Sequence, residues 1–184
     1  MKKEHQIKIE NYEKPIRELI GKSISIVNYY EIDYGEPLWN KTEYHSLDFG
    51  IEFTTSENES CYFVWGSEFT QYNLKFKKGD ILTVFSAENN AKKYNASENE
   101  HWTELIGVRI TGIKSSWSYW NLVGDKKRNY YPQDIEIEFK NGKKIWISAL
   151  EIRDGKPMGM QDHLTVFFDK KIANKYKTGI NNVW

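Results

Sequence analysis

Apolar and polar residues alternate along several stretches of this chain, and such alternation is typical of β-strands that bury one face. The clearest stretch is residues 134–148, where Asp-Ile-Glu-Ile-Glu-Phe and Lys-Ile-Trp-Ile-Ser flank Asn141-Gly142. Asn-Gly between two alternating runs is the strongest short signal for a β-hairpin. Residues 48–53 and 61–65 predict a second hairpin with a longer turn at 56–60. Further strands are predicted at residues 23–28, 109–114, 82–85 and 164–168.

Short helices are predicted where apolar residues recur at i, i+3 and i+4. Residues 15–20 show this spacing, with Pro15 suited to the first helical turn, and residues 102–106 show it again. A glycine follows each stretch and predicts the end of the helix. A third helix near the end of the chain places three residues on one side, namely Ile172, Ala173 and Tyr176.

Two blocks of the chain match later blocks in the same order, which indicates an internal repeat. With a shift of 86 residues, 18–53 matches 104–139 without gaps at 11 of 36 positions. Chance would give about one match in fifteen for an ordinary composition. With a shift of 82, residues 82–94 match 164–176 at 7 of 13 positions. We interpret the chain as a tandem duplication; independently acquired strand patterns in a biased composition are the alternative.

The repeat predicts a fold of the α+β class that is mostly antiparallel β. Repeat one spans residues 13–94 and repeat two spans residues 99–176, each with a helix and four or five strands. A single sheet of this size has an apolar face to bury, and the sister repeat can cover it. The segment between the repeats is short, polar and unlike a Pro/Gly-rich linker. We therefore expect one pseudo-two-fold body rather than two separate domains.

Composition and charge weigh against several classes of function. Lys and Arg number 26 and so do Asp and Glu, and only 4 of the cations are Arg. We expect no nucleic-acid partner, because such binding usually relies on excess positive charge. We expect no membrane association either, since no apolar run approaches the ~20 residues that span a bilayer. The N-terminus lacks the apolar segment of a secretory signal, and the single Cys61 cannot form an internal disulfide, which favours a cytoplasmic protein.

Two aromatic stretches, residues 29–46 and 115–133, are the best candidates for a binding surface. Aromatic residues recur at equivalent positions while the residues between them differ, as expected of variable loops on a common scaffold. Tyr and Trp give a large contact area at low entropic cost, which suits a protein interface or a sugar-binding platform. The alternative is that these rings form the core between the repeats. The candidate binding residues are Tyr34, Trp39, Tyr44, His45, Trp117, Tyr119, Trp120 and Tyr130.

Carboxylates at equivalent positions of the two repeats are candidates for catalysis. The structural interpretation is that each Asp caps a turn and each Glu lies on the solvent face of a strand. The histidines and the single cysteine lack the spacing of a metal site, and no phosphate-loop or nucleophile motif is present, so we expect no metal and no cofactor. The catalytic candidates are Asp48 with Asp134, Glu52 with Glu138, and Asp162 with His163.

One pattern resembles a known group of proteins. It consists of Leu-Ile-Gly, Ile, Asp-x-x-Ile-Glu-Phe, Asn-Gly and Ile-Trp-Ile at residues 105–147, with a looser version at 19–64. It resembles the strand-rich domains of small uncharacterised bacterial proteins, some of them encoded beside polymorphic toxins as immunity proteins. The resemblance covers the hairpin core of each repeat and brings no catalytic residues. It implies a cytoplasmic, non-enzymatic protein that binds a partner.

Together these observations favour a non-enzymatic binding protein whose partner is another protein, contacted through the aromatic stretches. The first alternative is a module that binds a carbohydrate or another small ligand with the same rings. The second is a hydrolase that uses the repeated acids. An enzyme of that kind predicts that these acids converge in a cleft and have shifted pKa values.

Overall fold

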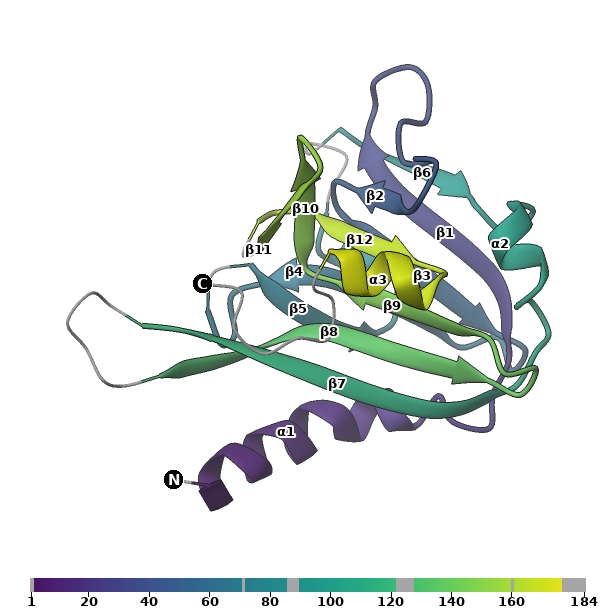
Figure 1. Cartoon of the computed structure of the whole chain (residues 1–184). Helices are drawn as coiled ribbons and strands as arrows, with labels where there is room; N and C mark the ends of the chain where they lie inside the picture. The colour runs from purple at the N-terminus through teal and green to yellow at the C-terminus, as the bar shows by residue number, and fades with distance from the viewer. Residues whose placement is uncertain (1, 71, 86–89, 122–127, 160, 177–184) are drawn as a thin grey trace.

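Two five-stranded antiparallel sheets form the body of the protein in the computed structural model, which describes residues 2–70, 72–85, 90–121, 128–159 and 161–176 (Figure 1). The first sheet has the order β5-β4-β3-β1-β6. Its strands are β1 (Ile24–Ile32), β3 (Gly50–Thr55), β4 (Ser60–Gly66), β5 (Asn73–Lys78) and β6 (Ala91–Asn95). The second sheet has the order β2-β12-β9-β8-β7. Its strands are β2 (His45–Leu47), β7 (Ile110–Trp120), β8 (Asn129–Phe139), β9 (Lys144–Ser148) and β12 (Leu164–Phe167).

The helices are few, which confirms the prediction of a mostly antiparallel β protein. They are α1 (Lys2–Arg17), α2 (Glu100–Thr103), α3 (Lys170–Lys175) and the 3-10 helix η1 (Ile81–Thr83). A small hairpin of β10 (Leu150–Arg153) and β11 (Lys156–Gly159) completes the described elements. Within the described residues, no helix is both long enough and apolar enough to cross a membrane.

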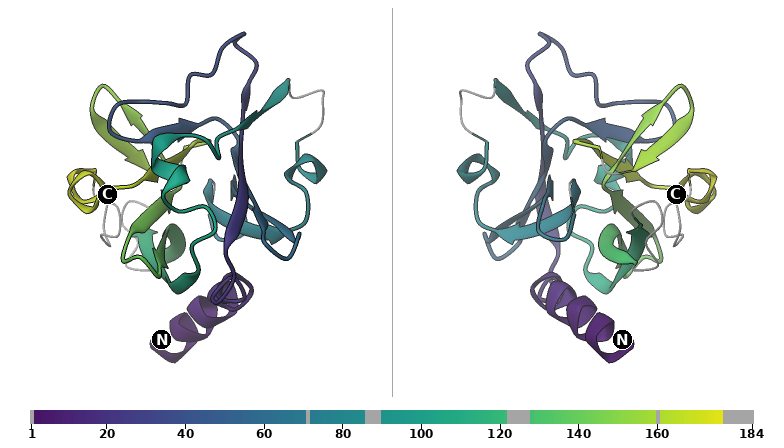
Figure 2. Two further views of the ribbon diagram at one scale, coloured as in Figure 1. Left: turned by 90° about the vertical axis from the view of Figure 1, so that its right-hand side faces the viewer. Right: turned by 90° about the vertical axis from the view of Figure 1, so that its left-hand side faces the viewer.

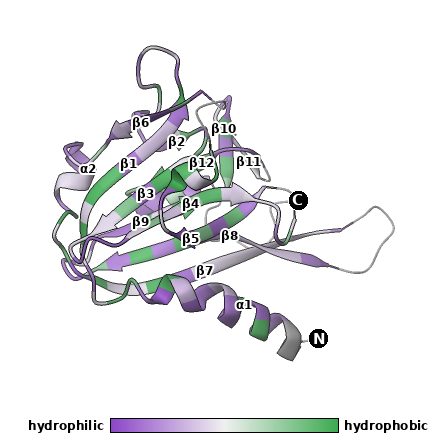
Figure 3. Cartoon of the chain, turned by 180° about the vertical axis from the view of Figure 1, so that it is seen from behind, coloured by the Kyte–Doolittle hydropathy of each residue, from purple (hydrophilic) through white to green (hydrophobic). Residues whose placement is uncertain are grey.

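Both predicted hairpins are present. Asn141-Gly142 joins β8 to β9, and Gly142 has a φ of +81°, which favours glycine. The longer turn at 56–60 joins β3 to β4. Figure 3 shows hydrophobic and hydrophilic residues alternating along several strands, which is the pattern that predicted them.

The main core lies between the two sheets, which face one another in Figures 1 and 2. Val27, Phe53 and Phe63 contribute to it from the first sheet, and Ile137 and Ile147 from the second. The fully buried Trp102 of α2 belongs to the same core, and its ring meets that of Phe53 at a centroid distance of 5.7 Å. The two sheets therefore bury their apolar faces against each other.

The outer face of each sheet carries a smaller apolar cluster. On the first sheet, Ile81 and Phe85 cover Tyr30, Tyr62 and Val64. On the second sheet, Ala173 and Tyr176 of the α3 region pack with Trp146, Leu150 and Phe167. Short helical segments thus cover both outer faces, so that several residues on the outer sides of the strands are buried.

The beginnings of β1 and β7 are joined by backbone bonds. The Gly21 N–H donates to the Ile110 carbonyl at 2.9 Å, and the Gly107 N–H donates to the Ile24 carbonyl at 2.8 Å. An antiparallel bridge between Ser23 and Arg109 lies between these two bonds. Gly21 corresponds to Gly107 at the shift of 86, and Ile24 corresponds to Ile110. Each half of the chain therefore gives the other an equivalent hydrogen bond, and the two bonds are reciprocal. We call this region the joint.

The first predicted helix begins earlier than expected. Pro15 lies in the last turn of α1 rather than in its first turn, because the helix already starts at Lys2. The stretch before Pro15 is rich in charged residues, and its apolar positions Ile7, Ile9 and Tyr12 do not have the spacing that predicts a helix. Ile16 and Leu19 are buried as expected, whereas Ile20 is exposed.

The prediction for residues 82–94 is wrong. Leu82–Phe85 was expected to be a strand, as Leu164–Phe167 is, but it lies in and after η1, which Asp80 caps by accepting from the Leu82 N–H. Residues 91–94 form part of β6, whereas their counterparts 173–176 lie in and just after α3. The similarity at a shift of 82 therefore joins segments of different structure. In the first sheet β5 is the neighbour of β4, and in the second sheet β12 is the neighbour of β9. The strand in the position of β12 is therefore β5, and not residues 82–85.

Replacing Gly21 or Gly107 by Ala should lower the free energy of unfolding by roughly 1–2 kcal/mol, because both have positive φ (93° and 75°). A Cβ atom would meet nothing within 4 Å at either position, so backbone strain alone is tested. Gly112→Ala is the control, since Gly112 has no positive φ and its Cβ would make ordinary contacts. Urea unfolding measures all three; a loss in Gly112→Ala as large as in the other two would contradict this account.

Candidate functional site

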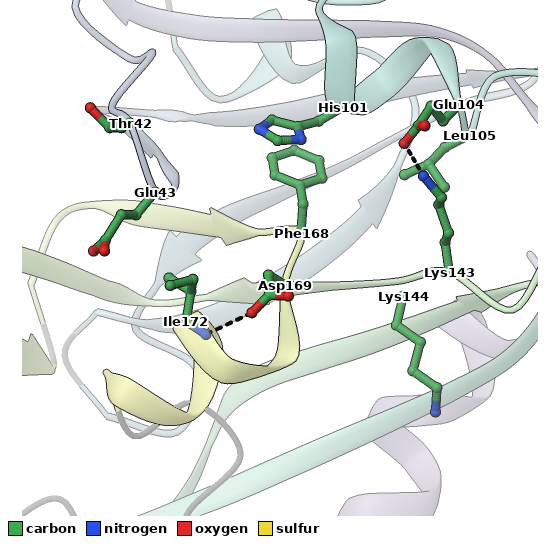
Figure 4. A pocket seen from close by; sticks show the side chains of 10 residues that line it. All are labelled: Thr42, Glu43, His101, Glu104, Leu105, Lys143, Lys144, Phe168, Asp169 and Ile172. Atoms are coloured by element: carbon green, nitrogen blue, oxygen red, sulfur yellow. Dashed lines mark hydrogen bonds and ion pairs between the residues drawn. The ribbon is translucent and has the colours of Figure 1, made fainter.

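A groove lies where α2, the β8–β9 turn and the start of α3 meet (Figure 4). Its volume is about 400 Å³, within the range of about 300–1,000 Å³ that is usual for small-ligand sites. The apolar part of its lining comes from Leu105, Phe168 and Ile172. The polar part comes from Thr42, Glu43, His101, Glu104, Lys143, Lys144 and Asp169.

Most charged groups in the groove are paired. Lys143 forms an ion pair with Glu104, which Figure 4 shows as a dashed line. Glu43 pairs with Lys175 at 2.7 Å and accepts from the Tyr176 hydroxyl at 3.0 Å. Asp169 accepts from backbone N–H groups at the start of α3, including that of Ile172. The groove therefore offers little net charge to a ligand.

Two stacked rings form the inner wall of the groove. The imidazole of His101 lies over the ring of Phe168, with a centroid distance of 4.5 Å and an angle of 11° between the planes (Figure 4). Phe168 also meets Trp102 edge-on at 5.2 Å. The stack thus connects the groove with the main core.

A chain of buried hydrogen bonds runs behind this stack. The Trp102 indole N–H donates to the Tyr29 hydroxyl at 2.6 Å, and that hydroxyl lies 2.7 Å from Nδ1 of His45. Because indole can only donate, the hydroxyl hydrogen is free to be given to Nδ1. His45 then carries its own hydrogen on Nε2, which has no hydrogen-bond partner among the described residues.

Burial keeps His45 neutral. Its side chain is fully enclosed, and this loss of solvation lowers its pKa to about 3, with a smaller contribution from the charge of His101. A neutral imidazole is also the form that accepts from Tyr29. His45 is therefore a polar core residue on β2, and its contact with Tyr29 links this edge strand of the second sheet to β1 of the first.

Three of the eight predicted binding residues are buried, and their rings are not offered at the surface. Trp39 packs edge-on against Tyr29 and His45. Trp117 on β7 packs against α1, where its ring meets that of Tyr12 at a centroid distance of 5.6 Å. Trp39, His45 and Trp117 are therefore core residues, which was the alternative interpretation of the aromatic stretches.

The other five predicted binding residues are at least partly exposed. Tyr34 is 52% exposed in the segment after β1. Tyr44 is half-buried between Phe167 and Tyr176 on the outer face of the second sheet. The remaining three, Tyr119, Trp120 and Tyr130, are half-buried on the ends of β7 and β8 that lie farthest from the joint.

The structure brings together two of the predicted catalytic candidates, Asp48 and His163. Asp48 Oδ1 lies 3.3 Å from His163 Nε2, and Asp48 Oδ2 accepts from the Ile32 N–H at 3.0 Å. The pKa of His163 is raised, first by its hydrogen bond to Asp48. Burial opposes the ionisation of Asp48, but the bonds to His163 and Ile32 outweigh it and lower the pKa.

Glu31 is a member of this cluster that the sequence did not single out. It is buried beside Asp48 and accepts from the Asp48 N–H at 3.2 Å. Burial, followed by the charge of Asp48, raises its pKa to about 8. An isolated Glu within an aromatic run gives no signal of this kind, because the partner that perturbs it is 17 residues away.

The remaining catalytic candidates have structural partners of their own. Glu52 faces away from Ile51 and Phe53 as predicted, but it is buried rather than solvated because η1 covers it and the Ile81 N–H donates to it at 3.1 Å. Asp134 is buried and accepts from the Ser148 hydroxyl. Asp162 lies 3.5 Å from Nδ1 of His163, and Glu138 lies at 3.2 Å from Lys144.

Metal-binding geometry is absent from the described part of the chain, where no three His, Cys, Asp or Glu side chains are grouped suitably. Cys61 is buried, and this burial raises the pKa of its thiol to about 12. Comparison with models of protein families, with curated proteins and with solved structures finds no match.

Replacing Tyr29 by Phe should lower the free energy of unfolding by roughly 2–4 kcal/mol, because it leaves two buried polar atoms, on Trp102 and His45, without partners. Tyr34→Phe is the control, since its exposed hydroxyl should change stability by no more than about 0.5 kcal/mol. Denaturant unfolding compares the two variants with the parent chain. Equal stability of all three would show that the buried chain of bonds is not needed.

Glu31 should make the protein less stable as the pH rises from about 4.5 to 8. Its pKa is higher in the folded chain than in the unfolded chain, so its contribution is complete at low pH and is lost as the folded carboxyl ionises. The loss attributable to Glu31 is about 4 kcal/mol. Glu31→Gln should flatten the profile of unfolding free energy between pH 5 and 8, leaving a smaller slope from His163. Parallel profiles for both proteins would refute this assignment.

Proposed function

We propose that this chain is a non-enzymatic binding protein whose partner is another protein. The surface proposed for the contact is the projecting end of β7 and β8. The observation that carries the proposal is a group of three side chains there, Tyr119, Arg128 and Tyr130, which we call the ribbon cluster. The sequence resemblance to small strand-rich proteins, some of them immunity proteins, supports the same class of function.

The ribbon cluster lies where the second sheet narrows to two strands. The pairing of β9 with β8 ends at Asp134, whereas β7 continues to pair with β8 as far as Asn129. Figure 1 shows this end of β7 and β8 extending away from the other strands. Backbone groups and side chains of a projecting two-stranded ribbon are accessible to a partner in a way that those of an inner strand are not.

The three side chains of the cluster are held in contact before any partner arrives. Tyr119 and Tyr130 are directly opposite one another in the ladder, with ring centroids 5.7 Å apart. The guanidinium of Arg128 lies 4.4 Å from the centre of the Tyr119 ring. Tyr and Arg are among the residues that most often dominate the energy of protein interfaces, and preordered side chains lose less entropy on binding.

The base of the ribbon is anchored to the body. Trp117 is buried, donates to the Ser115 hydroxyl at 3.0 Å and packs edge-on against Phe69 at 5.0 Å. His5 of α1 lies 4.2 Å from the ring of Tyr130. Because a two-stranded ribbon alone is marginally stable in water, these contacts support its rigidity.

The chemistry of the cluster defines the partner. Arg128 contacts rings, and within the described residues it has no ion pair with a carboxylate. A partner that places a carboxylate against Arg128 and an apolar surface against the two tyrosines would satisfy all three side chains. We therefore propose a protein partner with an acidic group at the centre of its contact surface.

We also propose that the chain arose by tandem duplication of repeats 13–94 and 99–176, packed as a pseudo-two-fold body. The reciprocal bonds of the joint support it, and so do irregularities of strand pairing at two equivalent places, between Ile24 and Ile26 and between Ile110 and Gly112. The support covers the segments that match at a shift of 86. Residues 82–94 and 164–176, which match at a shift of 82, differ in structure and do not support the duplication.

A small ligand in the groove is the second candidate function. The stacked pair of His101 and Phe168 favours it, because an exposed ring face within a concave site can stack against a planar group or a sugar. The paired charges of the groove favour a neutral ligand over an ionic one.

The test is capture of partners from native cell lysate with the full chain as bait. In the variant Tyr119→Ala/Arg128→Ala, a partner that is stoichiometric with the parent chain should be lost or bound at least tenfold more weakly, as expected for two dominant interface residues. The matched control is Tyr34→Ala, which removes an exposed ring elsewhere and should retain the partner. Circular dichroism checks that both variants are folded.

Two results would count against the ribbon. A partner that the double variant retains but that His101→Ala loses would assign the contact to the groove. If the parent chain captures no protein while Trp fluorescence responds to a neutral sugar, the small-ligand function replaces the protein-binding one.

A further inference from the structure

We propose that the joint carries a second binding site, which takes the phosphate group of a small molecule. The site is a surface depression between the beginnings of β1 and β7, on the side of the β3–β4 and β8–β9 turns. It is distinct from the groove and from the ribbon cluster, since it shares no lining residue with either.

The depression has a volume of about 520 Å³, so it can hold more than the phosphate group alone. Gly21 and Gly107 contribute to it from the two halves of the chain, and the space where a Cβ would lie is open at both. The backbone bonds at these glycines hold its two sides together. A preformed depression of this kind needs little rearrangement to admit a ligand.

The charge of the lining is positive. Arg109 and Lys140 are its two ionisable residues, and none of its eight residues is acidic. Among the described residues, neither cation has an ion-pair partner within 4.0 Å. The nearby Lys22 differs from them, because it is held by Glu57 and Glu59. Two unpaired cations beside a concave surface favour an anion.

Hydrogen-bond donors accompany the two cations. The Ser23 hydroxyl donates to the Ser56 hydroxyl at 3.0 Å, so the hydrogen of Ser56 remains available for an acceptor. Asn141 uses one of its two amide hydrogens on the Glu104 carbonyl at 3.0 Å, and the second remains. Hydroxyl and amide donors next to Arg and Lys satisfy several oxygen atoms of one group at once.

These donors suit a phosphate better than a carboxylate. A guanidinium can bind two oxygens of a phosphate side by side, and Lys supplies a point charge to a third. A carboxylate has only two oxygens for the four groups that line the depression. The two sources of such chemistry are inorganic phosphate and a phosphate monoester, and the larger volume of the depression favours the monoester.

The experiment is a titration of the full chain with inorganic phosphate and, separately, with phenyl phosphate, at constant ionic strength maintained with chloride. Backbone amide NMR shifts of Gly21 and Gly107 locate the binding, and calorimetry gives its affinity. We expect shifts at both glycines with either probe and tighter binding of phenyl phosphate. Equal affinities would assign the site to inorganic phosphate.

Arg109→Gln and Lys140→Gln should each weaken binding by about tenfold. Lys156→Gln is the matched control, since it removes an exposed cation from β11, far from the joint in the chain, and should leave the affinity unchanged. Should Arg109→Gln fail to fold, Ser56→Ala tests the same site and should weaken binding severalfold. The proposal is overturned if neither glycine responds to about 50 mM phosphate, or if the control weakens binding as much as the two joint variants.

Discussion

The reciprocal backbone bonds of the joint are the constraint on which the arrangement of the two sheets depends. The Gly21 N–H reaches the Ile110 carbonyl and the Gly107 N–H reaches the Ile24 carbonyl, so β1 and β7 must begin side by side. From that corner each strand leads into its own sheet, and the apolar faces of the two sheets meet across Trp102. Both glycines have a positive φ, which lets the chain change direction after the preceding helix and form these bonds. The packing of the core therefore depends on these two small residues.

Buried polar groups then determine how the segments outside the two hairpins are attached. Tyr29 joins α2 to β2 by accepting from Trp102 and contacting His45, and Glu52 attaches η1 to the first sheet. The Asp48–His163 pair connects the bend between β2 and β3 with the segment that leads into β12. Each group requires its particular partner, because a buried polar atom without one is costly. Apolar contacts supply most of the stability, and these bonds select one arrangement of the covering segments.

The sequence predicted the parts of the fold that local signals determine. Asn141-Gly142 and the alternation around it were sufficient for the β8–β9 hairpin. The apolar stripe before Gly107 predicted a helix over residues 102–106, but α2 spans Glu100–Thr103 and overlaps only the first two of them. Leu82–Phe85 was misassigned because a short, mostly apolar run can cover a sheet as well as extend one, and the cap from Asp80 favours a helical turn. The Asp48–His163 contact lies beyond sequence reasoning, since 115 positions separate the two residues and no spacing rule joins them. Burial of His45 and Trp117 likewise depends on which distant segments pack against their strands.

The two aromatic stretches look alike in sequence but differ in what they build, and that difference assigns the proposed contact surface to one of them. In the first half β1 ends at Ile32, and the chain then folds back so that Trp39 and His45 enter the core. In the second half β7 continues to Trp120, and β8 returns beside it from Asn129. The first stretch therefore places Trp39 and His45 in the interior, while the second carries Tyr119 and Tyr130 outward to the proposed contact surface.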